Sequence, residues 1–109
     1  MDTYREMQQS IAAYYGMHNQ SRQAVEEMAE LTQALTKFWR YKGMEQWTYN
    51  ELRSNIVEEL ADVQNMIEQL CILFRCGEDM EAEKKRKINR QMRRMQQEIE
   101  EEHTSEMKK

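Results

Sequence analysis

The feature that most constrains the fold of this chain is its shortage of turn-forming residues. The 109 residues include three glycines, Gly16, Gly43 and Gly77, and no proline. Folds built from β-strands need a turn every ~8–12 residues and use both residue types freely. Residues that favour helices fill the stretches between the glycines. We therefore expect an all-α fold of four helical segments that are separated near these glycines.

Sequence signals predict where the helices begin and end. The pattern Ser/Thr-x-x-Glu, which forms a capping box at helix N-termini, occurs at Thr3 and again at Thr48. The four expected helices cover residues 4–15, 22–41, 49–75 and 80–102. Residues 17–20 and 44–47 are expected as connections. Asn19 or Ser21 is the expected N-cap of the second helix, Gly77 the C-cap of the third, and Asp79 the N-cap of the fourth.

The length of the chain predicts one domain, which we place at residues 1–103, with residues 104–109 as a disordered tail. A small, polar chain buries a modest fraction of its surface. We therefore expect self-association to complete the core of a four-helix bundle.

The charge balance narrows the possible partners. The formal net charge is −4, so binding to nucleic acid or to a membrane surface is not expected, whereas binding of a metal cation is compatible. The first residues contain no apolar run, which argues against a secretory signal and a transmembrane helix and favours a cytoplasmic protein. Cys71 and Cys76 have no second cysteine pair or nearby histidine for a zinc site, and we expect reduced thiols.

Acidic residues occupy unusual positions on the third expected helix. Its apolar stripe is centred near Val63 and Leu70. At ~100° per residue, Glu59 falls within ~40° of that centre, whereas Glu58 points well away. Asp62 lies at the edge of the stripe and shares a face with Glu59. Both carboxylates are therefore expected at or beside the core.

The second expected helix carries a similar pair. Glu27 borders an apolar stripe, and Glu30 lies one turn further on. The stripe consists of Ala24, Met28, Leu31, Leu35 and Phe38. Four acidic groups on two helices repel one another unless a positive charge lies between them, and neither helix has a basic residue at the matching stripe positions. A Mg²⁺ or Mn²⁺ ion would meet this need. A solvated acidic face and ion pairing to the basic fourth helix are the alternatives.

These two acidic segments resemble a known family. Residues 24–31 (AVEEMAEL) and 56–63 (IVEELADV) are similar to the two halves of the MazG signature, E-x-x-E followed after a linker by E-x-x-D. The similarity extends over about residues 4–95, including residues 14–16, 19–20 and 87–91, and these segments resemble the small stand-alone MazG-like proteins of bacteria and their phages. The resemblance implies a helical nucleoside triphosphate pyrophosphohydrolase, assembled as a dimer or a dimer of dimers.

The resemblance also implies roles for particular residues. The metal ligands and catalytic residues would be Glu27, Glu30, Glu59 and Asp62. They would hold Mg²⁺ (with Mn²⁺ as a possible substitute) and cleave a ribo- or deoxyribonucleoside triphosphate to the monophosphate and pyrophosphate. In such a site the metal orients the α-phosphorus for attack by water, and a carboxylate takes the proton of that water. The motifs do not identify which carboxylate is the base.

The fourth expected helix carries the candidate phosphate ligands. Lys87, Arg90 and Arg94 share one face of that helix, and arginine suits bidentate contacts with phosphate. A solvated basic face, balanced by the acidic residues that follow, is the alternative. Asn19, Gln20 and Trp39, together with Trp47, are candidates for contacts with the base, although helix capping and core packing explain them equally well.

The chain departs from the family pattern at several positions. Ala29 and Ala61 stand where the family often has glycine, and a Tyr-Pro element that better-studied members carry is absent, with only Lys85 and Asn89 similar to it. Two rival functions are a non-catalytic helical interaction protein and a phosphoribosyl-ATP pyrophosphatase. A carboxylate-bridged di-iron bundle needs two Glu-x-x-His pairs, and the sequence has one such match, Glu100 with His103.

Overall fold

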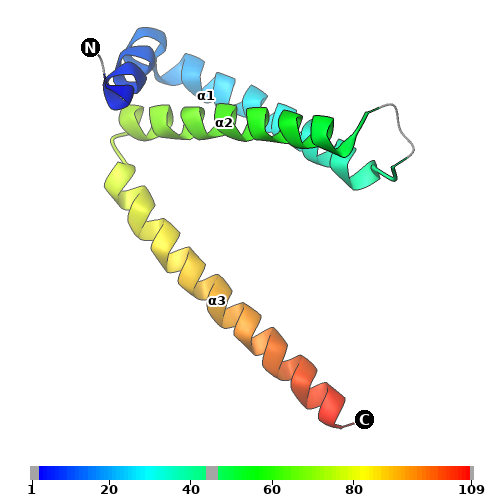
Figure 1. Ribbon diagram of the computed structural model, residues 1–109. Coiled ribbons are helices and arrows are strands. Elements are labelled where there is room, and N and C mark those ends of the chain that lie inside the picture. Colours follow the sequence, from blue (N-terminus) through cyan, green and yellow to red (C-terminus); the bar gives the residue numbers. More distant parts are fainter. Residues whose placement is uncertain (1–2, 44–46, 109) are drawn as a thin grey trace. The chain divides into compact units, whose positions relative to one another are not determined.

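The computed structural model describes residues 3–43 and 47–108, and the regular secondary structure over these residues is all helical (Figure 1). The helices are α1 (Tyr4–Arg40), α2 (Tyr49–Leu73) and α3 (Gly77–Met107). The predicted all-α class is therefore confirmed. Of the expected connection at residues 44–47, residues 44–46 lie outside the described residues, as does Lys109 of the expected tail.

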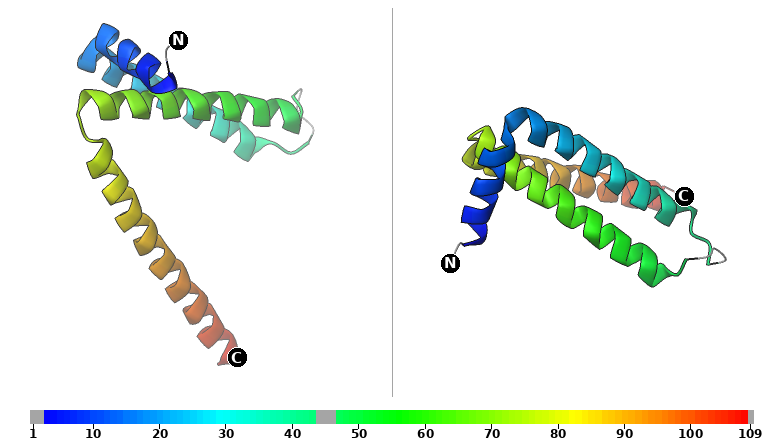
Figure 2. Two further views of the ribbon diagram at one scale, coloured as in Figure 1. Left: turned by 60° about the vertical axis from the view of Figure 1, so that its left-hand side comes forward. Right: turned by 90° about the horizontal axis from the view of Figure 1, so that it is seen from above.

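The chain divides into two compact units. The first ends at Arg75 and contains α1 and α2, which lie side by side in all three views (Figures 1 and 2). The second begins at Cys76 and contains α3. Residues 104–107, which we expected in the tail, belong to α3.

The predicted connection at residues 17–20 between the first two helices is wrong, because the helix is interrupted only at Gly16. Helical hydrogen bonding continues through residues 17–20, but Gly16 has non-helical dihedral angles (φ 84°, ψ 171°) and kinks α1 (Figure 2). Neither of the expected caps acts as one. Asn19 Nδ2 donates to the carbonyl of Tyr15 at 2.9 Å, and Ser21 Oγ donates to the carbonyl of His18 at 2.9 Å. The described residues thus form three helices instead of four, the first of them kinked.

Both predicted capping boxes are confirmed. At the start of α1, Glu6 N donates to Thr3 Oγ1 at 3.1 Å and Thr3 N donates to Glu6 Oε2 at 3.3 Å. At the start of α2, Glu51 N donates to Thr48 Oγ1 at 3.2 Å and Thr48 N donates to Glu51 Oε2 at 2.9 Å. These bonds satisfy amide groups that have no partner inside the helix.

The expected caps between α2 and α3 are wrong. Helix α2 ends at Leu73 with Phe74 as its C-cap, and Arg75 takes the left-handed conformation (φ 54°) that we expected of a glycine. Gly77 is instead the first residue of α3, and Cys76, not Asp79, is the residue before that helix. The turn therefore lies a few residues earlier than the glycine position suggests.

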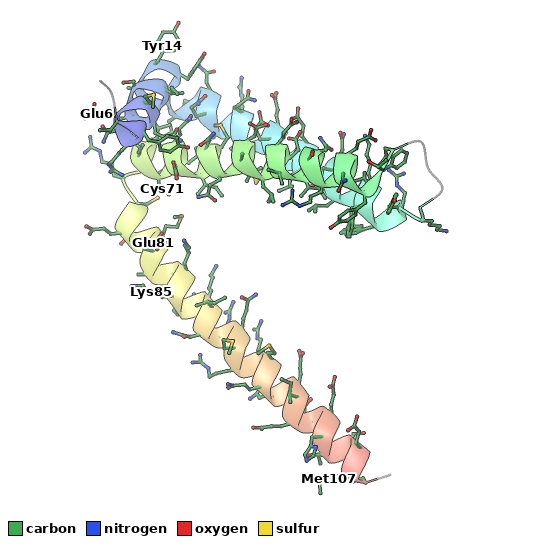
Figure 3. The ribbon with its side chains drawn as sticks, viewed as in Figure 1. Glu6, Tyr14, Cys71, Glu81, Lys85 and Met107 are labelled. Atoms are coloured by element: carbon green, nitrogen blue, oxygen red, sulfur yellow. The ribbon has the colours of Figure 1, made fainter. Side chains whose placement is uncertain are left out.

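The core of the first unit is narrow. Its buried apolar residues are Ala12, Ala24, Ala34, Leu52 and Met66. Leu31 and Leu35 of the expected α1 stripe are half-buried, whereas Met28 and Phe38 are exposed. Two packed helices cover only the faces that they turn towards each other, so the edges of a wide apolar stripe stay in solvent. Tyr14 projects from the pair and is largely exposed (Figure 3).

Buried amides join α2 to both parts of the kinked α1. Gln69 Nε2 donates to Gln8 Oε1 at 2.7 Å, and Gln20 Nε2 donates to Gln69 Oε1 at 2.5 Å. Gln8 precedes the kink and Gln20 follows it. The kink at Gly16 therefore lets one residue of α2 bond to two segments of α1, and the exchange of hydrogen bonds offsets the cost of burying these amides. Among the described helices, none combines the length and apolar character needed to cross a bilayer.

Candidate metal centre

Four carboxylates from two helices converge in the first unit. Glu27 and Glu30 extend from α1, and Glu59 and Asp62 extend from α2. One oxygen from each of these side chains lies within 4.8 Å of those of the other three. Each pair is spaced i, i+3 and so shares one helix face, and the packing of α1 against α2 brings the two pairs together. We call these four residues the acidic cluster.

The cluster has an enclosed half and an open half. Glu27 and Glu59 are half-buried, and Oε2 of each is shielded from solvent without a hydrogen-bond partner. Glu30 and Asp62 are exposed. A shielded carboxylate oxygen without a donor is costly because it has lost its water without gaining a replacement. A cation held between the two helices would remove this cost.

The protonation of Glu59 reflects the same environment. Burial raises the pKa of the Glu59 carboxyl, and the Glu30 carboxylate raises it further, through charge repulsion and as acceptor of a hydrogen bond from the protonated acid. Asp62 and Glu27 add smaller contributions in the same direction. These influences oppose ionisation, as expected for a carboxyl surrounded by like charges. A divalent cation would act in the opposite direction.

One neutral donor supports the cluster, and the sequence reasoning missed it. Gln23 Nε2 donates to Glu27 Oε1 at 2.8 Å. This contact leaves Oε2 of Glu27 as the oxygen without a partner. Donors of this kind orient carboxylate ligands in metal sites. The i, i+4 spacing of Gln23 and Glu27 was the available signal, since residues at that spacing are neighbours on a helix.

The chemistry of the cluster fits a hard divalent cation. All four ligands are carboxylate oxygens, which Mg²⁺ and Mn²⁺ prefer. Oxygen ligands on opposite sides of Mg²⁺ lie about 4.2 Å apart, given metal–oxygen distances of 2.0–2.1 Å. The four ligand oxygens of the cluster, one from each carboxylate, all lie within 4.8 Å of one another, which is close to this separation. Small side-chain movements would therefore suffice to coordinate the ion.

The residues predicted to contact the base differ in their exposure and in their hydrogen bonds. Gln20 is 6% exposed, and its amide bonds to Gln69, which gives it a structural role. Asn19 is exposed but donates to its own helix. Trp39 is 74% exposed near the end of α1. Asn19 and Gln20 do line one surface hollow, whose other residues are Tyr15, Arg22, Gln23 and Glu26.

The predicted phosphate ligands belong to the second unit. Lys87, Arg90 and Arg94 are exposed on α3. Two ion pairs within α3 use other cations, namely Lys84 with Glu81 at 3.2 Å and Arg86 with Glu83 at 2.7 Å. The phosphate role of Lys87, Arg90 and Arg94 stays a prediction.

When the chain was compared with protein-family models, with curated proteins and with solved structures, none of the three comparisons found a match.

Proposed function

We propose that this chain is a MazG-like, Mg²⁺-dependent nucleoside triphosphate pyrophosphohydrolase. It would convert a ribo- or deoxyribonucleoside triphosphate and water into the monophosphate and pyrophosphate. The observation that supports this proposal most strongly is the acidic cluster, in which four carboxylates from two helices lie within 4.8 Å of one another and two of them carry shielded oxygens without partners.

The four carboxylates of the cluster and the neighbouring Gln23 would have different roles in such a site. Glu27, Glu30, Glu59 and Asp62 would hold Mg²⁺, or Mn²⁺ in its place, and Gln23 would keep Glu27 in position. When bound, the metal would neutralise phosphate oxygens and activate water for attack at the α-phosphorus. A carboxylate of the cluster would accept the proton of that water. A triphosphate is itself densely anionic, so these carboxylates can approach it only through a cation.

Other parts of the chain would bind the rest of the substrate. Lys87, Arg90 and Arg94 share one face of α3 and are exposed, as phosphate ligands must be before substrate binds. Trp39 offers an exposed ring for stacking against a base.

The proposal includes a four-helix bundle completed by oligomerisation. The kinked α1 supplies two helical segments and α2 supplies a third, so the bundle needs a further helix to pack on this unit. Met28, Val57 and Leu60 are large apolar residues of the first unit that are about half exposed. Apolar surface of this kind favours burial against further helices. The expected assembly is a homodimer or tetramer.

Product analysis tests the proposed reaction. A panel of ribo- and deoxyribonucleoside triphosphates, with phosphoribosyl-ATP added, would be incubated with the full chain and Mg²⁺, and products would be separated by chromatography. Monophosphate and pyrophosphate should appear with wild type and vanish in Glu59→Gln. Glu58→Gln is the matched control, because Glu58 is the exposed neighbour on the same helix and should leave turnover unchanged. A diphosphate product, or no turnover with either Mg²⁺ or Mn²⁺, would overturn the proposal.

One observation favours the rival function of a non-catalytic helical interaction protein. The apolar residues of α3 are largely exposed, with Ile88, Met92, Met95 and Ile99 all near half exposure. Metal-linked stability separates the two functions. Mg²⁺ with nucleotide should raise the melting temperature of an enzyme that binds them, because a ligand of the folded state stabilises it. An interaction protein without the site should show no such rise.

A further inference from the structure

We propose that α3 associates with α3 of a second copy of this chain, in antiparallel orientation, through the seam formed by Ile88, Met92, Met95 and Ile99. The proposal specifies which surface mediates self-association and how the two helices are oriented, and it is independent of whether the chain is an enzyme. The spacing of the seam is four, three and four residues, which is the repeat by which two helices pack along a common line.

The side chains of the seam are not buried by other residues of α3. Its members are between 45% and 56% exposed, and none of the described residues of α3 is buried. The side chains of α3 extend from the helix along its whole length, from Glu81 and Lys85 to Met107 (Figure 3). A lone helix cannot cover its own apolar stripe, and most helix stability in proteins comes from packing such a stripe against a partner.

The order of charges along α3 favours a second α3 as the partner of the seam. After the acidic first turns of α3, residues 84–94 carry only basic charges, and residues 98–106 carry acidic charges and no lysine or arginine. The basic residues are Lys84, Lys85, Arg86, Lys87, Arg90, Arg93 and Arg94, and the acidic ones are Glu98, Glu100, Glu101, Glu102 and Glu106. A second α3 in antiparallel orientation places each basic part beside an acidic part. A parallel copy would place like charges together.

The helix dipole does not explain this order of charges. Acidic residues near the C-terminus of a helix are unfavourable, and cations are preferred there. The last turn of α3 holds no basic residue, although Lys108 follows as the C-cap, and the acidic run lies just before that turn. Within one helix the basic run and the acidic run are neighbours only where they meet, whereas an antiparallel pair sets the basic run of each copy beside the acidic run of the other.

The antiparallel register also matches the apolar residues. With the two-fold axis midway between Met92 and Met95, Met92 packs against Met95 of the partner subunit. One layer further out, Ile88 packs against Ile99 of the partner subunit. The next layer pairs Lys85 with Glu102 of the partner subunit. Every layer over residues 85–102 therefore joins either two apolar side chains or two opposite charges.

This pairing leaves the proposed phosphate face open. At ~100° per residue, Lys87, Arg90 and Arg94 lie more than about 100° from the centre of the seam. The same helix can therefore bind its copy on one side and phosphate on the other.

Molar mass by light scattering, over a dilution series of the full chain, tests the seam. Met92→Lys places a charge in the seam twice, once from each copy, and should weaken association at least about tenfold. Gln97→Lys adds the same charge to the outer side of the same helix and should leave association unchanged. Circular dichroism would show that both variants keep their helix. A chain that is monomeric at its highest soluble concentration, or a dimer that both variants leave intact, would overturn the proposal.

Charge exchange tests the orientation. Lys85→Glu and Glu102→Lys should each weaken association, because each sets like charges opposite one another in the antiparallel pair. The double variant K85E/E102K restores opposite charges and should recover wild-type association. In a parallel pair each of these residues faces its own copy, so the double variant would recover nothing beyond the single variants. That result would overturn the antiparallel arrangement, whether or not the chain is active on nucleotides.

Discussion

The carboxylate of Glu59 on α2 lies within 4.8 Å of the carboxylate of Glu30 on α1. Burial and then this neighbour raise the pKa of Glu59. Two helices that pack against each other would ordinarily place apolar groups or opposite charges at such a contact. The contact of two acids therefore indicates a place that a cation can stabilise.

The stability of the metal-free chain should depend on pH through Glu59. Because folding raises the pKa of Glu59 above its usual value of 4.5, the folded chain holds this proton more tightly than the unfolded chain. The stabilisation is complete below the unfolded pKa and is lost as pH rises through the folded pKa. Urea unfolding of wild type and Glu59→Gln across this range isolates the effect. Relative to the variant, wild type should lose stability as pH rises.

Saturating Mg²⁺ should change how the stability of the chain depends on pH. The cation favours the ionised carboxylates and competes with the proton on Glu59. Its apparent affinity should therefore rise with pH over the same range, and wild type with Mg²⁺ should no longer lose stability relative to Glu59→Gln. A stability difference that is independent of pH in the metal-free proteins would contradict the raised pKa.

Gln23 should act on the cluster through Glu27. Gln23→Met keeps the length of the side chain and removes the hydrogen bond of 2.8 Å to Glu27. Loss of a group that orients a ligand typically lowers metal affinity 10–100-fold, so we expect a decrease of at least about tenfold. Titration with Mn²⁺, followed by its paramagnetic resonance signal, measures this affinity. Gln33→Met, at an exposed position of the same helix, should bind as wild type does. Equal affinities in the two variants would remove Gln23 from the site.

Gly16 should be required for the kink in α1. Its dihedral angles, φ 84° and ψ 171°, belong to a region that is essentially restricted to glycine. A Cβ atom at this position would meet nothing within 4 Å, so the cost of Gly16→Ala is conformational. We expect a loss of about 1–3 kcal/mol in the free energy of unfolding. Gly77→Ala is the control, since that residue also has open space but no positive φ. A comparable loss in both variants would contradict this account of the kink.

The sequence predicted features that depend on local spacing. The capping boxes at Thr3 and Thr48 involve residues three apart, and the geometry of one helical turn determines them. The acidic cluster was expected because Glu59 falls on the apolar face of its own helix. Its partners Glu27 and Glu30 follow once the faces of two helices are matched.

Other features depend on contacts between distant residues and had no local signal. Residues 17–20 contain good capping residues, yet they are helical in the structure because Gly16 alone absorbs the change of direction. The bond between Gln20 and Gln69 then gives this segment a tertiary partner. Arg75, not Gly77, takes the left-handed conformation after α2, which intrinsic preference alone would not indicate.

Calorimetric titration of Mg²⁺ into the full chain tests the central claim most directly. The four carboxylates should bind the ion at a single site in wild type and in Glu58→Gln. Glu59→Gln removes one ligand and should weaken binding at least about tenfold, since a change in an outer-shell group already costs that much. The same variant should be more stable than wild type without metal, because it relieves the repulsion around Glu59. Absence of Mg²⁺ and Mn²⁺ binding to wild type, or equal binding to Glu59→Gln, would contradict a metal centre at this cluster.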